Sequence, residues 1–196
     1  MTERDNFVFF WGKQDIASNW HPAKFEVRGR KFGQAEQYMM YAKACLFNDQ
    51  EMADKILQET DPAKNKKQGR QVRGFDQAIW DQKADELVKI GLREKFLQNP
   101  RMLQWLVSTE GKQLAEASPY DKIWGIGLKA NHPDAVTPEK WPGQNRLGKT
   151  LEQLRDDLLL KPEALPPRAA KAVENAKAAV AGARGRQYSV GSGPAF

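Results

Sequence analysis

Glu36 and Lys43 are the two residues whose types and spacing first suggest chemistry. They lie seven residues apart in a segment, residues 34 to 47, that is otherwise almost wholly apolar. Seven residues span two turns of an α-helix, so both side chains would leave the same face. An apolar helix is normally buried, and a carboxylate and an amine on it then need a partner, a cleft or a shifted pKa. The pattern therefore predicts an active site on this helix.

An ordinary amphipathic helix, with Glu36 and Lys43 facing solvent, is the alternative interpretation. Met40 lies between them on the same face, which argues against a fully hydrated stripe. Ionisable groups with shifted pKa values mark active sites only statistically. The choice between an active site and a solvent-facing stripe therefore depends on the elements that would position the two residues.

Short elements precede this helix. Residues 7 to 11, Phe-Val-Phe-Phe-Trp, read as a strand, and a polar loop with Ser18 and Asn19 follows. The alternation of apolar residues around Arg28-Gly29 predicts a β-hairpin over residues 25 to 32. His21 stands beside Pro22, which indicates a turn rather than catalysis.

The rest of the chain predicts helices and one long loop. Asp61 followed by Pro62 is typical of a helix N-terminus. Apolar residues recur at helical spacing over residues 49–57, 80–96, 102–107 and 147–160. Residues 124 to 143 are mostly loop formers, and an ordered loop of that length is often functional. We expect a mainly α (α+β) protein, with one catalytic domain over residues 1–160 and a small antiparallel β element near its N-terminus.

The net charge of +6 is concentrated in the C-terminal part. Residues 161–196 hold six Lys and Arg against two Glu, which is +4 and leaves +2 for residues 1–160. This Pro/Ala/Lys-rich tail has few large apolar residues, so we expect a helix-prone, undocked segment that ends in disorder. A solubilising or linker role is favoured over a weak polyanion contact.

Several kinds of chemistry lack their usual residues. The chain has two histidines and one cysteine, too few for a four-ligand zinc site, so no metal is expected. Phosphate-binding and dinucleotide-binding glycine loops are missing. Cys45 is expected to be a small core residue, and the absence of a signal peptide or apolar span predicts a cytoplasmic protein.

In its order of motifs the chain resembles the NADAR or YbiA-like N-glycosidases. Their pattern runs aromatic strand, Ser-Asn, hairpin, and then Glu-x-x-Tyr and Lys on one helix. The likeness continues, over roughly residues 7 to 160, through Asp61 to Lys64, Gly69-Arg70, Trp80, Lys95-Phe96, 106–109, 116–118, 121–125, 145–148 and Arg155. The resemblance implies a YbiA-like fold, no cofactor, and Glu36 and Lys43 as the family's motif glutamate and lysine.

The family's members cleave phosphoribosylamino-pyrimidine intermediates of riboflavin synthesis, and some relatives remove ADP-ribose from guanine in nucleic acid. Both substrates join C1 of a ribose to an exocyclic amine. Such cleavage needs a carboxylate to stabilise the sugar cation and an acid to protonate the leaving nitrogen. Lys43 would receive the sugar as an imine, or else Glu36 would direct water onto the closed ring.

Further residues are candidates for binding the substrate. Lys64 and Arg70, with Arg73 as a weaker candidate, would hold the phosphate, whereas Lys66 and Lys67 are expected to be solvated. Trp80 and Trp124 would stack on the base or belong to the core. The other polar candidates, for which loop capping is the alternative, are Asn19, Glu116, Asp121 and Asn145. A non-catalytic module that binds ADP-ribose or NAD is the competing function, although it would have no use for Glu36 and Lys43 together.

Overall fold

Five short strands and seven α-helices make up the part of the chain that the computed structural model describes: the backbone of residues 1 to 189, with side chains to residue 182. Strand β2 (Phe7–Phe10) pairs antiparallel with β1 (Thr2–Arg4) and parallel with β5 (Gln113–Glu116). All four β2 side chains are buried, because the main core covers one face of this strand and the loop over residues 126–141 covers the other. Strand β2 was thus predicted, but neither β1 nor the parallel strand β5 was.

The predicted hairpin is confirmed as a separate two-stranded sheet. Strand β3 (Phe25–Val27) pairs with β4 (Arg30–Phe32), so that Phe25 lies opposite Phe32. The turn residues Arg28 and Gly29 have φ angles of 48° and 77°. Positive φ at both central positions is the geometry that matches the twist of a tight hairpin.

The helices follow their sequence signals closely. They are α1 (Ala35–Leu46), α2 (Gln50–Gln58), α3 (Pro62–Gly69), α4 (Gln77–Leu97), α5 (Pro100–Ser108), α6 (Arg146–Leu160) and α7 (Pro167–Ser189). Asp49 and Asp61 cap α2 and α3 by accepting hydrogen bonds from backbone N–H groups. The long loop after β5 contains two 3-10 turns, Pro133–Val136 and Pro138–Lys140, and a third follows α6 at Pro162–Ala164.

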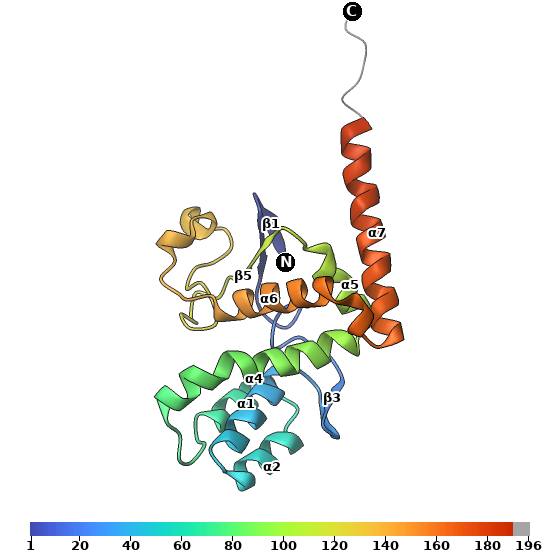
Figure 1. The fold of residues 1–196 in the computed structure, drawn as a ribbon. Helices are drawn as coiled ribbons and strands as arrows, with labels where there is room; N and C mark the ends of the chain where they lie inside the picture. Colours follow the sequence, from blue (N-terminus) through green and yellow to red (C-terminus); the bar gives the residue numbers. More distant parts are fainter. Residues whose placement is uncertain (190–196) are drawn as a thin grey trace, which may run out of the picture.

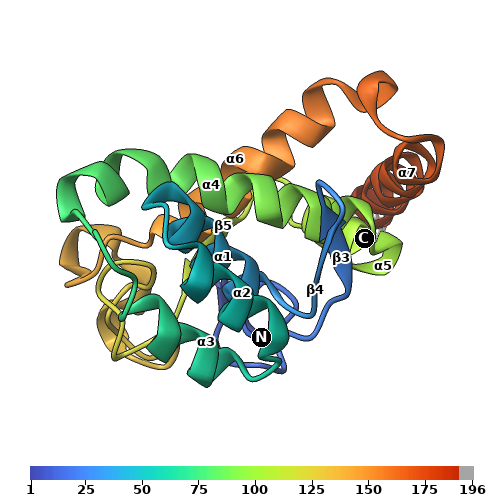
Figure 2. The ribbon, with the colours of Figure 1, turned by 90° about the horizontal axis from the view of Figure 1, so that it is seen from below.

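Helix α4 is the centre of the layered arrangement in Figure 1. Helices α1 and α2 lie on one side of it and α6 on the other, with the three-stranded sheet beyond α6. Helix α3 faces the start of the long loop, where Lys66 pairs with Asp121, and Figure 2 shows the β3–β4 hairpin on the other side of α2. Two glycines allow close contacts between layers: a Cβ on Gly91 would lie 2.1 Å from the Tyr38 ring, and one on Gly148 would lie 2.0 Å from the Leu114 carbonyl oxygen.

The expectation of an undocked tail is wrong for its first part. Ala169, Ala172, Val173 and Ala176 are buried and form one stripe of α7, which packs against α5. Small side chains at i, i+3, i+4 and i+7 suffice because they let two helices approach closely, and Figure 1 shows the rest of α7 projecting from the body. The expected disordered end falls on residues 190–196, outside the described residues.

Two further observations concern expectations from the sequence. Cys45 is exposed rather than part of the core, because it faces away from the buried stripe of α1. Within the described residues, none of the helices has the length and hydropathy needed to cross a membrane.

Candidate active site

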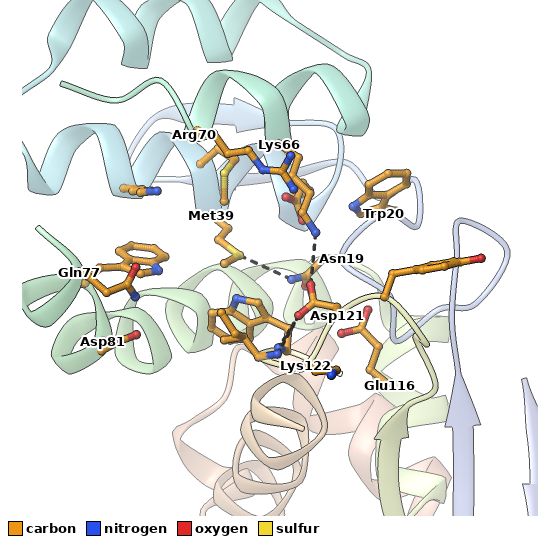
Figure 3. A pocket seen from close by; sticks show the side chains of 18 of the residues that line it. Asn19, Trp20, Met39, Lys66, Arg70, Gln77, Asp81, Glu116, Asp121 and Lys122 are labelled. Carbon is orange, nitrogen blue, oxygen red and sulfur yellow. Dashed lines mark hydrogen bonds and ion pairs between the residues drawn. The ribbon is translucent and has the colours of Figure 1, made fainter. Parts of the chain in front are cut away.

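A cleft of about 660 Å³ separates α1 and α3 from the start of α4 and the loop that follows β5. Its lining includes Asn19, Trp20, Glu36, Met39, Met40, Lys43, Lys66, Gly69, Arg70, Phe75, Gln77, Trp80, Asp81, Glu116, Tyr120, Asp121, Lys122, Ile123 and Trp124. Figure 3 shows Gln77 and Asp81 at one end and Trp20 and Glu116 at the other. Glu36 and Lys43 therefore do face the same cleft, as their helical spacing predicts.

Two carboxyl groups, Glu36 and Glu116, dominate one end of this cleft. Burial raises the pKa of Glu36 to about 7, against the opposing effect of the nearby Lys66 charge. Burial also raises the pKa of Glu116 to about 8, and the negative charges of Asp121 and Glu36 add to this effect. Near neutral pH the pair can therefore hold a proton and a negative charge at the same time.

Asp121 behaves differently from these two glutamates. Partial burial raises its pKa, but the backbone N–H groups of Trp124 and Ile123 and the charge of Lys66 outweigh that effect, so its pKa lies below the usual value. Lys66 Nζ lies 3.3 Å from the carboxylate (Figure 3). This ion pair places a fixed cation beside Glu36 and Glu116.

Lys43 occupies a different part of the cleft from the carboxyl pair. Its Nζ lies 3.8 Å from the centre of the Phe75 ring and 5.7 Å from that of Trp80. Burial, and then the positive charge of Arg70, lower its pKa. A partly desolvated amine next to another cation is more readily deprotonated and so more nucleophilic.

Asn19 presents an unpartnered acceptor in the same cleft. Its side chain is buried, and in the described part of the chain no donor reaches Oδ1. Buried polar atoms normally have a hydrogen-bond partner, so this oxygen is suited to a donor on a ligand.

The loop of Asn19 is held by an unusual lysine. Lys95 is fully buried and donates to the carbonyl oxygens of Ile16 and Ser18, both at 2.8 Å. The Asn19 carbonyl then accepts from the backbone N–H of Glu36 at 2.9 Å. Lys95 thus fixes the loop against the start of α1.

Asn145 lies outside the cleft and acts on it through the backbone. In a left-handed conformation, with φ of 53°, it accepts a hydrogen bond from the Glu116 N–H at 3.1 Å and donates to the Leu114 carbonyl at 2.8 Å. It therefore holds the end of β5, and Glu116 with it, rather than contacting a ligand.

The basic residues that line the cleft are not the ones that were predicted to bind phosphate, with the exception of Arg70. Lys64 is exposed, pairs with Glu59 at 3.5 Å and does not line the cleft, and Arg73 pairs with Asp49 at 2.8 Å. Arg70 does line the cleft, but so does Lys66, which was expected to be solvated. The reason is helical spacing: Lys66 and Arg70 are four residues apart and share a face of the α3 segment, whereas Lys64 points elsewhere.

The two candidate tryptophans line the cleft in different ways. Trp80 is only 6% exposed, so it is mainly a core residue that forms part of the wall. Trp124 is partly buried and its ring faces the Arg146 guanidinium, 5.1 Å away.

The lining residues that the sequence did not suggest come from three segments. Trp20 directly follows the Ser-Asn pair, Phe75, Gln77 and Asp81 surround the start of α4, and Tyr120, Lys122 and Ile123 flank Asp121. Adjacency to predicted site residues was the available signal for Trp20 and for the Asp121 loop. At the start of α4 the same signal was available for Asp81, which follows Trp80, but not for Phe75 or Gln77.

Comparison with known proteins identifies relatives over most of the chain. A family model described as NADAR domain matches residues 9–159. N-glycosidase R617 of Acanthamoeba polyphaga mimivirus is 42% identical over 166 residues, which cover 79% of this chain and 98% of that protein. Protein irg-1 of Caenorhabditis elegans is 36% identical over 173 residues, with coverages of 80% and 82%. The NMR structure of the Escherichia coli protein YbiA has the same fold, with a TM-score of 0.68, 23% identity, and coverage of 84% of this chain and 92% of that chain.

Proposed function

The chain belongs to the NADAR family, and from this premise we propose that it is an N-glycosidase that hydrolyses the bond between C1 of a phosphorylated ribose and an exocyclic amine of a base. The observation that carries the proposal is the pair of carboxyl groups of buried Glu36 and partly buried Glu116, which face the same cleft as several cations. The relative named N-glycosidase R617 supports the reaction class, because the match covers nearly the full length of that relative.

The two carboxyl groups take opposite roles in this mechanism. Glu116, which the negative charges of Asp121 and Glu36 help to keep protonated, is the acid that protonates the departing nitrogen. Glu36, beside the positive charge of Lys66, carries the negative charge that stabilises positive charge developing at C1. When two neighbouring groups differ in this way, acid and base chemistry can proceed near neutral pH.

The cations and the free acceptor orient the sugar. Arg70, whose charge acts on Lys43, forms the phosphate contact, since arginine suits bidentate phosphate binding, whereas Lys66 is already paired with Asp121. Asn19 Oδ1 accepts a hydrogen bond from a ribose hydroxyl, which would satisfy its unpartnered lone pairs. Trp124 provides an apolar wall for the base.

Lys43 is the group that receives the sugar. Opening of the ribose ring gives an imine at C1, the neutral Lys43 amine attacks C1, and the base leaves with its amine nitrogen. Water then hydrolyses the lysine imine and releases the sugar. The lowered pKa of Lys43 favours this route, whereas the Lys66 amine is engaged in an ion pair with Asp121. Direct attack of water on the closed ring, with Glu36 as base, is the rival route.

A direct assay tests the proposal. Purified protein is incubated separately with a ribosylaminopyrimidine phosphate and with guanine-ADP-ribosylated DNA, and the released base or sugar is identified by mass spectrometry. We expect release from at least one substrate. Tight binding of ADP-ribose without release from either substrate would instead identify a binding module.

A further inference from the structure

Two exposed aromatic rings, Trp11 and Tyr120, stand beside the cleft and have no role in the proposed reaction. Tyr120 lines the cleft and is 83% exposed, and Trp11 is 48% exposed. Their ring centres are 6.1 Å apart, with the planes tilted by 52°. Large aromatic side chains bury substantial area when they can, so a paired, exposed set next to a cleft indicates a surface for a planar ligand.

The sheet topology explains why these rings meet. Strands β2 and β5 are parallel neighbours, with Phe10 opposite Glu116 at their carboxyl ends. Trp11 is the next residue after β2, and Tyr120 lies four residues after Glu116. Both rings therefore leave the same edge of the sheet as the proposed acid.

Hydrogen bonds hold the backbone of the two loops that carry these rings. Asp15 Oδ2 accepts a hydrogen bond from the Trp11 N–H at 2.8 Å, and its other carboxylate oxygen pairs with the N-terminal amine of Met1. On the other loop, Asp121 Oδ1 accepts from the N–H groups of Ile123 and Trp124 at 3.0 and 2.9 Å. A surface that is held before binding loses less conformational entropy when a ligand stacks on it.

The position of the pair identifies the part of the substrate that it would contact. In the proposed reaction Glu116 protonates the leaving nitrogen, so the base lies at this end of the cleft. Lys43, which receives the sugar, lies instead beside Phe75 and Trp80. A ligand group that reaches Trp11 must therefore extend beyond the leaving base, away from the sugar.

We propose that Trp11 and Tyr120 form an outer subsite that stacks a second planar base linked covalently to the base that leaves. This inference rests on the proposed function and narrows it to substrates in which the modified base is part of a nucleic acid strand. A free nucleotide has no group in that position. Stacking uses the π-face that every base presents, so the subsite would tolerate any neighbouring base.

Binding of unmodified single strands tests the subsite independently of catalysis. The probes are a labelled trinucleotide with guanine at its centre and the same trinucleotide with abasic flanking positions, measured by fluorescence anisotropy with the full chain. We expect Trp11→Ala and Tyr120→Ala each to weaken binding of the first probe about tenfold and of the second less than about twofold. Trp11→Phe and Tyr120→Phe should restore most of the affinity, and Leu160→Ala, at an exposed site remote from the cleft, should change nothing. Equal effects on both probes, or no effect on either, would overturn the subsite.

A kinetic arm separates this inference from the proposed function. On ADP-ribosylated guanine within a strand, the alanine variants should raise KM about tenfold and leave kcat unchanged. On a ribosylaminopyrimidine phosphate Trp11→Ala, at a residue outside the lining of the cleft, should change neither constant. If the wild-type chain cleaves neither substrate but the binding pattern holds, the reaction is wrong, and what stands is a surface on which Trp11 and Tyr120 stack the flanking bases of a strand. If both substrates are cleaved and the variants slow both equally, the reaction stands and the subsite is wrong.

Binding of free ADP-ribose gives a further check on the subsite. Weaker binding of free ADP-ribose to Trp11→Ala would also overturn the subsite, because adenine would then stack on Trp11 and Tyr120.

Discussion

Glu36 is the residue whose charge the proposed reaction requires, and replacing it tests whether that charge serves cleavage rather than folding. Glu36→Gln preserves size and removes the charge that stabilises the developing sugar cation. We expect the variant to fold and cleavage to fall on the order of a hundredfold or more. Turnover measured beside the wild type and beside the exposed control Glu110→Gln gives the comparison, and near-normal turnover in folded Glu36→Gln would exclude the assignment.

The same residue makes stability depend on pH. The pKa of Glu36 is about 7 when folded, above the ordinary value of 4.5 that it regains on unfolding. The stability contributed by its neutral form is therefore fully present below pH 4.5 and is lost as pH rises through 7. We compare the free energy of unfolding of Glu36→Gln with that of the wild type at each pH. We expect this difference to be about 2 to 3 kcal/mol more favourable to the variant at pH 8.5 than at pH 4.5. Urea unfolding of both proteins at the two pH values measures this, and an identical difference at both would contradict the burial argument.

Lys43 can be tested by trapping. If it receives the sugar as an imine, borohydride reduction during turnover should leave a sugar adduct on Lys43, which peptide mass spectrometry can locate. Lys43→Ala should give no adduct, and Lys66 provides an internal control because its amine is paired with Asp121. An active Lys43→Arg enzyme, together with no adduct at several quench times, would support direct attack of water.

At the scale of elements, the contact between α1 and α4 limits what the core tolerates. A Cβ at Gly91 would lie 2.1 to 2.8 Å from atoms of the Tyr38 ring, which is itself packed against Phe25 and Phe32. We expect Gly91→Ala to destabilise the protein by about 1 to 3 kcal/mol, since the ring has little room to move. Gly182→Ala is the matched control, because nothing lies within 4 Å of its Cβ position. It should be neutral or stabilise α7 by up to about 1 kcal/mol.

The elements themselves were predicted from the sequence to very different degrees. The helices and the β3–β4 hairpin were predictable because caps, apolar spacing and turn residues such as Asp61 and Gly29 are local signals. Strand β5 was not, because its four residues contain only two apolar ones and its identity as a strand depends on pairing with β2. Lys66 was misjudged because charge alone does not say which face of α3 is turned inward. Asn145 was recognised as a motif residue, but its contact with the Glu116 backbone required the fold.

At the scale of the whole molecule, α7 packs against α5 and none of its residues lines the cleft. Truncation after Leu160 removes the buried Val173 and three buried alanines and uncovers α5. We expect the free energy of unfolding to fall by about 2 to 4 kcal/mol, with cleavage of a small substrate retained at temperatures where the truncated chain stays folded. Truncation after Gly182 should leave the melting temperature unchanged. If the chain truncated after Leu160 melted at the same temperature as the full chain, the α5–α7 contact would contribute nothing to stability.

The parallel pairing of β2 with β5 has a consequence for how the protein is made. Strand β2 emerges from the ribosome early, but its parallel partner follows only after on the order of 100 more residues, which take roughly 5 to 20 seconds to synthesise. During that interval Phe9 and Phe10, both almost fully buried in the finished protein, lack the partner strand that helps to cover them. The wall of the cleft formed by α1 and α3 is complete long before the wall that carries Glu116, and Asn145, which fixes that wall, comes later still. The nascent chain therefore carries an incomplete cleft and an uncovered apolar strand, and we expect it to be most prone to aggregate at this stage.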